Sequence, residues 1–507
     1  MSAQLSSLAE PRTALALPPG AASLASRLAA AALCAAIVLV LAVLNPDMQH
    51  PFLIPVLACG ILLSWDACRW LRGECDLFDS VVIFSLVGMQ LWFVAPLLHV
   101  WFDYWMPYVD PPRDWRPWLA RMAWLNFGGL VIYRTCVAFC PTDRGPRAAQ
   151  PLFVVDRTRL LIAAGASMAL SFVLQAMVYA KFGGISGYVH AFSEGSDQFT
   201  GLGFVFMFSE SLPIVSLITV VALYGDRPWL RTSAGVLLLI LAFITLKLLF
   251  GGLRGSRGHF IYGLFWAAAL LHYYVRPFTR QFCFVGLIAL VAFMYVYGLY
   301  KSFGLSAMDV LRDRATRVER MEAAPRSIEA VLLGDLGRSD AQAILLQRMS
   351  PESLMPEYRL KYGGTYVGSL AQLIPRRFWP NRPGTKVVAA TEILFGPQAY
   401  ENDIVSTFAF GLTGEAILNF GVLGGLLSFI AIAAVVLGNA RWQHVLHPLD
   451  SRRLIAPLAL TLTYMVPLWD TDVLLFYVVK EGAVPGLVLW FGSRRYLSAA
   501  PAAEIAR

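Results

Sequence analysis

The sequence carries little charge for its length. Only 15% of its 507 residues are Asp, Glu, Lys or Arg, whereas soluble domains carry roughly 25%. Hydrophobic residues make up 57% of the chain, which excludes an ordinary soluble enzyme and indicates a polytopic membrane protein. The net charge of +8 requires no nucleic acid partner, because the cytoplasmic loops of membrane proteins are rich in arginine.

Cysteine and the common soluble-enzyme signatures are also scarce or missing. The seven cysteines lie in apolar runs or in loops assigned below to the cytoplasm, and none lies in the long polar segment 300–407. This distribution argues against a disulfide framework. The sequence has no phosphate-binding P-loop, dinucleotide fingerprint, His-Glu-x-x-His metal motif or nucleophile elbow. We therefore expect neither a metal nor an organic cofactor.

Long apolar runs, by contrast, are abundant. A membrane-spanning helix needs about 20 apolar residues, and the sequence predicts an all-α membrane protein with about twelve such helices, in a range of roughly 11 to 14. Nine fall within 28–299 and three within 408–491, with tails at 1–27 and 492–507. The tail 1–27 lacks the pattern of a cleavable signal peptide. The expected helices are 28–44, 51–65, 80–101, 117–138, 160–180, 202–224, 233–250, 259–275, 281–299, 408–438, 454–469 and 473–491.

The arginines predict the orientation of these helices, because short cytoplasmic loops are enriched in Lys and Arg. Alternate connections carry most of the arginines, which places both termini in the cytoplasm and 300–407 on the outer side. The arginines on the cytoplasmic side are Arg69, Arg72, Arg144, Arg147, Arg157, Arg159, Arg227, Arg231, Arg276, Arg280, Arg441, Arg452, Arg453, Arg494 and Arg495.

The polar segment 300–407 interrupts the series of apolar runs. Residues 306–323 predict a charged surface helix, and 326–349 predict a more amphipathic helix broken near Gly334 and Gly337. A connection of this length is either functional or disordered. Its apolar and aromatic content favours an ordered, partly helical lid.

Two arginines stand on the outer side, where arginine is unusual. Arg254 and Arg257 lie in a glycine-rich loop, residues 251–258, that leads directly into an apolar helix. Glycines allow close approach of a ligand, a helix N-terminus favours anions, and guanidinium groups bind phosphate in a bidentate manner. The loop predicts a phosphate or pyrophosphate site, to which Lys247 and His259 are the nearest additional candidates. The alternative is that these arginines set topology or contact lipid headgroups.

A second constellation follows in the polar segment. Arginines and aromatic residues on a proline-framed loop suit a carbohydrate that carries phosphate, since rings stack on sugars and guanidinium groups bind the phosphate. A solvated basic loop is the alternative. The candidates for substrate binding are Arg359, Lys361, Tyr366, Arg376, Arg377 and Trp379.

Carboxylates form the third set of candidates. Glu415 stands where the tenth expected helix enters the membrane, a costly position that indicates function or pairing. Glu415, with Asp403 and His259 behind it, is our candidate for a general base. Glu210, Lys480 and Glu481 lie inside apolar runs, and we expect them to pair between helices, with ion translocation left open.

Three motifs stand out: Gly-Ser-Arg-Gly at 255–258, Gly-x-Tyr … Ile-Pro-Arg-x-x-Trp-Pro-x-x-Pro at 364–383, and Gly-x-x-Gly-Glu … Asn-Phe-Gly-x-x-Gly at 411–424. Together they resemble the bacterial oligosaccharide repeat-unit polymerases, the O-antigen polymerases, over roughly residues 60–490. The Arg-x10-Gly motif described for some members occurs at Arg134–Gly145 and Arg326–Gly337, which is near the number expected by chance, and assigns no role.

This resemblance implies a protein of the bacterial inner membrane with about twelve spans and a large periplasmic loop, which corresponds to 300–407. It also implies polymerisation of undecaprenyl-pyrophosphate-linked oligosaccharides into O-antigen, capsule or exopolysaccharide, with membrane lipid, a chain-length regulator and a flippase as partners. Two other functions stay open. One is the related O-antigen ligase, and the other is a lipid-linked oligosaccharide flippase or transporter, for which broken helices with polar sites would be expected.

Overall fold

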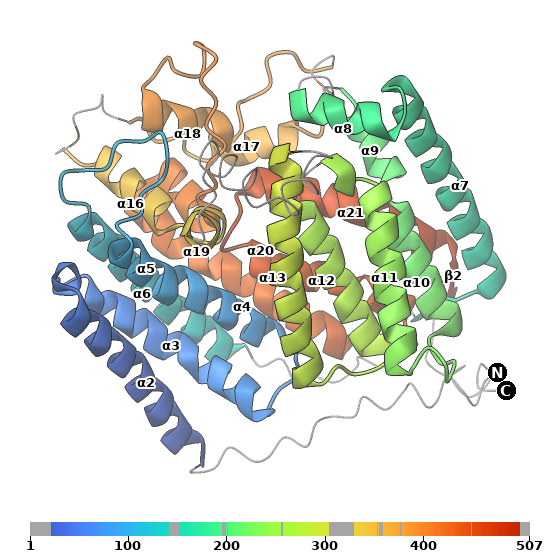
Figure 1. Ribbon diagram of the computed structural model, residues 1–507, viewed down its shortest axis with the longest axis horizontal. Coiled ribbons are helices and arrows are strands. Elements are labelled where there is room, and N and C mark those ends of the chain that lie inside the picture. The colour runs from blue at the N-terminus through green and yellow to red at the C-terminus, as the bar shows by residue number, and fades with distance from the viewer. Residues whose placement is uncertain are drawn as a thin grey trace, which may run out of the picture.

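The computed structural model describes residues 22–140, 152–194, 199, 201–254, 257–303, 329–351, 353, 358–375, 378–447 and 449–496. Within these ranges the chain is mostly helical (Figure 1). Eight helices are long and apolar enough to cross a membrane. The all-α, membrane-embedded class predicted from the sequence is therefore confirmed.

Every one of the twelve expected segments coincides with a helix in the described part of the chain. Three of these helices, Ser233–Leu249, Phe260–Tyr274 and Arg280–Phe293, are apolar but shorter than the eight. A fourth, Ala456–Met465, has ten residues. The number twelve therefore stays a prediction.

The N-terminal helices form one side of the molecule (Figure 1). A π-helical turn joins two α-helices into a single span at Ser80–Trp101. The turn precedes Pro96, whose missing N–H and bulky ring disrupt regular α-helical bonding. The elements are α2 (Ala22–Leu44), η1 (Pro46–Met48), α3 (Leu53–Arg72), α4 (Ser80–Met89), the π-turn η2 (Gln90–Val94), α5 (Ala95–Trp101) and α6 (Arg116–Phe139).

The next group forms the opposite side of the molecule (Figure 1). One span, Gly203–Tyr224, is interrupted at Glu210 and Ser211, just before Pro213. The elements are β1 (Leu152–Val155), α7 (Arg157–Lys181), α8 (Ile185–Glu194), α9 (Gly203–Ser209), α10 (Leu212–Tyr224), α11 (Ser233–Leu249), η4 (Gly252–Arg254), α12 (Arg257–Tyr274) and α13 (Arg280–Phe303).

The C-terminal helices lie between these groups. Gly129 of α6 allows the close packing of α6 on α19, because a Cβ at this position would lie 2.1 Å from the Phe429 ring of α19. The strand β2 pairs antiparallel with β1, a two-stranded sheet that the sequence did not predict. The elements are α19 (Gly411–Val445), η7 (Ser451–Ile455), α20 (Ala456–Met465), α21 (Thr471–Phe491) and β2 (Ser493–Tyr496).

Several arginine-rich connections meet at one end of the helices. Arg276 donates a 2.7 Å hydrogen bond to Ser233, and His272 lies 3.1 Å from Asp76. Arg494 pairs with Asp156 at 2.5 Å. Connections that the sequence assigns to a common side of the membrane thus contact one another in the fold.

The segment 300–407 contributes short helices at the other end, together with α8 (Figure 1). They are the π-turn η6 (Ala330–Asp335), α16 (Ser339–Arg348), α17 (Gly364–Ala371) and α18 (Lys386–Phe395). The break expected near Gly334 and Gly337 is present, but α16 is not amphipathic. Its residues 339–346 are all buried in a core shared with α6, α18 and α19. The helix expected at 306–323 lies outside the described residues.

Candidate functional site

Five charged side chains form a buried network, which we call the charge cluster: Glu210, Lys247, Arg254, Lys480 and Glu481. Lys480 Nζ lies 2.6 Å from Glu210 Oε2, and Arg254 pairs with the other oxygen, Oε1. Lys247 Nζ lies 3.1 Å from Glu481 Oε2. The cluster joins α11, η4 and α21 to the break between α9 and α10. The expected helix-to-helix pairing of Glu210, Lys480 and Glu481 is therefore confirmed.

Glycines create the space that these long side chains occupy. Gly251 has a φ of +111°, and a Cβ at this position would lie 2.6 Å from Glu210 Cδ. A Cβ on Gly263 would lie 2.9 Å from Lys247 Cε. Such contacts are too short for any residue larger than glycine without movement of the charged groups.

Tyrosines fix the backbone around Arg254. The hydroxyl groups of Tyr297 and Tyr300, both on α13, donate to the carbonyl oxygens of Gly252 and Leu253. The Arg254 guanidinium also stacks 3.9 Å from the centroid of Phe206 on α9, a cation–π contact that strengthens away from water. Arg254 is therefore held in place before any ligand arrives.

Positive charge exceeds negative charge within the cluster. Its three cations and two carboxylates (3 − 2) leave one positive charge. Lys480 lies near all four other charges, so they act as one group. The Arg254 side chain is 19% exposed, more than its four partners, and its Nε has no hydrogen-bond partner in the part of the chain that the structure describes. An unbalanced buried charge is costly, so the cluster is suited to accept an anion at Arg254.

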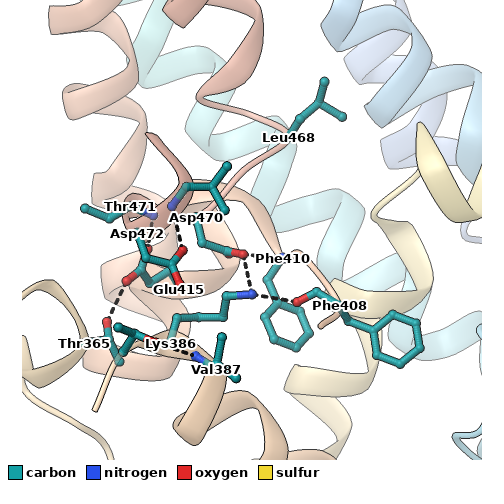
Figure 2. Close-up of polar contacts among 12 residues, drawn as sticks. Thr365, Lys386, Val387, Phe408, Phe410, Glu415, Leu468, Asp470, Thr471 and Asp472 are labelled. Atoms are coloured by element: carbon teal, nitrogen blue, oxygen red, sulfur yellow. Dashed lines mark hydrogen bonds and ion pairs between the residues drawn. The ribbon is translucent and has the colours of Figure 1, made fainter. Parts of the chain in front are cut away.

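Glu415 lies in a different network, at the start of α19 (Figure 2). Its Oε1 accepts a 2.7 Å hydrogen bond from Thr365 of α17, and its Oε2 accepts a 2.6 Å bond from the Thr471 N–H of α21. Asn419 donates to the same Thr365 hydroxyl at 2.7 Å. Glu415 is 0% exposed. It thus joins three helices and caps the start of α21, with both oxygens occupied.

A buried ion pair lies next to Glu415 (Figure 2). Lys386 Nζ on α18 lies 2.7 Å from Asp470 Oδ2 and donates a 2.8 Å bond to the Phe408 carbonyl. Asp470 also accepts the Phe410 N–H at 3.1 Å. Burial raises the pKa of the Asp470 carboxyl, and Lys386 opposes that rise. The pair fixes α18 against the turn before α21.

A break in α19 explains how the preceding loop is attached. Gly421 has non-helical angles inside α19 (φ 69°, ψ −160°). Beside the break, the N–H groups of Lys361 and Tyr362 donate to the carbonyls of Leu418 and Asn419 at 3.2 and 3.0 Å. The loop therefore supplies hydrogen bonds to this part of α19, as a broken membrane helix requires.

The charge cluster and the Glu415 network are separate but linked by α21. Thr471 contacts Glu415 and Lys480 contacts Glu210. From 471 to 480, a helix rises roughly 13 Å. The expected convergence of Glu415 on Arg254 does not appear among their contacts, because Arg254 binds Glu210 and Phe206 instead.

The remaining predicted residues have varied positions. Lys361 pairs with Glu392 at 2.6 Å. Arg359 and Trp379 are exposed, and Asp403 is exposed in a turn with a φ of +61°. Tyr366 is half-buried on α17, where burial and the nearby Glu415 and Asp470 raise the pKa of its hydroxyl, which therefore stays protonated. Arg376 and Arg377, and the side chains of Arg257 and His259, lie outside the described residues.

The sequence did not single out Lys386 or Asp470. Asp470 immediately precedes the last apolar run, a position typical of a helix cap, and this was the available signal. Lys386 lies in a polar loop, where a lysine gives no sign that it is buried. Comparison of the chain with protein-family models, with curated proteins and with solved structures finds no match.

Proposed function

We propose that this protein polymerises undecaprenyl-pyrophosphate-linked oligosaccharide repeat units at the periplasmic face of a bacterial inner membrane. The observation that carries the proposal is the net positive charge cluster, with Arg254 as its most exposed member. Arg254 lies in η4, which contacts α8 at the end of the molecule that also carries α16, α17 and α18. A lipid pyrophosphate is an anion that would balance this charge, and the resemblance of the three motifs points to the same substrate.

In this proposal Arg254 stabilises the charge that develops on the leaving pyrophosphate. Glu210 and Phe206 hold the guanidinium in place, and groups fixed in advance at developing charge are the most effective. Arg257, on the first turn of α12, adds a second guanidinium. Lys247 and Lys480 keep the cluster positive. Because the five charges sit in an apolar body, their effect on a bound phosphate is stronger than it would be in water.

The acceptor sugar hydroxyl must lose a proton in the same reaction. Both oxygens of Glu415 already accept hydrogen bonds, and a general base must reach the hydroxyl within about 3 Å. We therefore assign Glu415 a positioning role and propose His259 as the base, with Asp403 second. Arg359, Lys361, Tyr366, Arg376, Arg377 and Trp379 would bind glycan and phosphate from the lid.

One set of observations favours a second function, transport of the lipid-linked oligosaccharide across the membrane. Glu210 lies at a break between α9 and α10, and Gly421 breaks α19. Broken helices with buried charges are typical of transporters. O-antigen ligase is a variant of the first proposal, since it would use the same donor site.

The deciding experiment uses purified protein in proteoliposomes with fluorescent lipid-linked repeat units. Polymerisation predicts a ladder of products separated by one repeat unit on a gel. Single units that only exchange between leaflets, without a ladder, would establish transport instead. A ladder that also forms with Arg254→Ala protein would separate polymerisation from the charge cluster and refute the proposed donor site.

A further inference from the structure

The outward face of α17 and the turn that follows it is unusually apolar. Val367 and Leu370 on the helix are 50% and 60% exposed, and Phe378 in the turn is 77% exposed. Ile374 and Trp379 are exposed beside them. We call this set the α17 face. Water-exposed surfaces seldom carry so continuous a set of large apolar side chains.

The opposite face of α17 carries small side chains, some of them polar. Thr365, Gly368, Ser369 and Ala371 are buried. A Cβ on Gly368 would lie 2.1 Å from the Gly384 carbonyl oxygen, so the helix packs very closely on the chain behind it. A helix at a protein–water boundary buries its large apolar residues. In α17 this pattern is reversed, as expected where large apolar side chains face lipid and small ones face protein.

Contact with lipid favours internal partners for backbone polar groups, and both ends of α17 have such partners. The last carbonyls of the helix and its following turn would otherwise lack one. Arg382 Nη1 reaches the carbonyl oxygens of Ala371, Gln372 and Ile374 at 3.3, 3.1 and 2.8 Å. At the other end, the N–H of Gly363 donates to Asn419 Oδ1 at 2.9 Å.

The α17 face continues into the apolar surface of a membrane-spanning helix. Tyr366 and Phe420 of α19 are ring neighbours, with centroids 6.3 Å apart. From Phe420 the exposed side of α19 runs through Leu423, Leu427 and Ile430. α19 is long and apolar enough to span the membrane, as expected of a helix whose exposed apolar side faces lipid. α17 meets this surface of α19 at the Tyr366–Phe420 contact.

We propose that α17 and the described residues of the turn that follows it, 373–375, 378 and 379, lie in the outer leaflet of the bilayer as an interfacial segment, with the acyl chains of membrane lipid covering Val367, Leu370, Ile374 and Phe378. The aromatic residue Trp379 suits the interface, where aromatic side chains are enriched. Arg359 is also exposed, and long basic side chains at such an interface extend toward lipid headgroups. This inference does not depend on the proposed polymerase activity. It places this part of 300–407 at the membrane surface, where the glycan of a lipid-linked substrate would also lie.

The test is site-specific photocrosslinking of the full-length protein in lipid nanodiscs. A diazirine-bearing amino acid replaces Leu370, and in a second variant Val367, both exposed enough to tolerate the change. The matched control places the same probe at Asn402, which is exposed in the same segment. Each variant is first checked as a single species by size-exclusion chromatography.

We expect lipid adducts at 370 and 367 by mass spectrometry, at several times the yield at 402. Yields no higher than at 402 would mean that the α17 face meets water and would overturn the proposal. Adducts at 370 and 367 to a second protein chain, in place of lipid, would overturn it as well and would identify a protein interface.

Discussion

Lys480 Nζ lies 2.6 Å from Glu210 Oε2, so the middle of α21 is joined to the break between α9 and α10. The start of α21 is held by Glu415 through the Thr471 N–H. One helix therefore connects the buried charge cluster with the network that anchors α17 and α18. The two networks can be disturbed separately by mutation.

The charge balance of the cluster predicts an unequal response to mutation. Glu210→Gln or Glu481→Gln leaves three cations and one carboxylate (3 − 1 = +2), whereas Lys480→Met leaves two of each (2 − 2 = 0). Breaking a buried pair costs about 3–5 kcal/mol, and we expect the two Gln variants near that range and Lys480→Met well below it. Thermal unfolding in detergent measures the difference. An equal decrease in unfolding temperature for all three variants would show that net charge does not govern the stability of the cluster.

Gly251 is predicted to be essential for the position of Glu210. Gly251→Ala introduces a Cβ 2.6 Å from Glu210 Cδ and should displace the carboxylate from Arg254. Gly184 is the matched control, because its φ of +99° is similar but a Cβ there meets nothing within 4 Å. Gly184→Ala should cost only about 1–2 kcal/mol of backbone strain. Thermal unfolding and product ladders are measured for both variants. Similar effects would mean that backbone strain, not the contact with Glu210, is the reason that residue 251 must be glycine.

Arg254 is predicted to be needed for activity more than for folding. Arg254→Ala should lower polymerisation by about 100-fold or more, the usual effect of losing a group that stabilises developing charge. Arg254→Lys should recover only part of the activity, because lysine lacks the bidentate fork. Arg113→Ala, an exposed arginine elsewhere, is the control and should behave as wild type. Normal ladders from Arg254→Ala protein, at equal amounts in the membrane, would contradict the prediction.

Removal of Lys386 should make stability depend on pH. Lys386→Met leaves Asp470 buried without its cation, and its pKa, already raised by burial, should rise further. The folded protein then holds this proton to a higher pH than the unfolded chain does. The stabilisation from protonated Asp470 is complete below the pKa that Asp470 has in the unfolded chain. It is lost as the pH rises through the pKa that Asp470 has in the folded protein.

We therefore expect Lys386→Met protein to unfold at a lower temperature at pH 8 than at pH 5, relative to wild type. The control is Lys361→Met, which removes the partly exposed pair with Glu392 and should cost no more than about 1 kcal/mol. A loss for Lys386→Met that does not vary with pH would show that Asp470 stays ionised without its partner.

The arginine distribution predicts the orientation of the chain. Alkaline phosphatase is active only in the periplasm, and green fluorescent protein fluoresces only in the cytoplasm. A phosphatase fusion at Gly334 should therefore be active, and a green fluorescent protein fusion after Arg495 should fluoresce. If both positions score in one compartment, the orientation and the periplasmic donor site are wrong.

The sequence by itself determined the class of the protein and the positions of its apolar helices. Apolar runs of about 20 residues have few structures available in a bilayer, because each backbone polar group must be bonded within the segment. The same logic identified Glu210, Lys480 and Glu481 as residues that need partners, since an isolated charge in that setting is too costly to keep.

Only the tertiary structure decided which partners those charges have. Lys247 pairs with Glu481 and Arg254 with Glu210 because helices far apart in the chain pack together, and no local pattern encodes that choice. For the same reason Glu415, expected near Arg254, instead binds Thr365 and Thr471. Lys386 and α16 are polar in sequence yet buried. Periodicity reports which face of a helix is apolar, but burial of polar groups depends on distant residues that supply their hydrogen bonds and opposite charges.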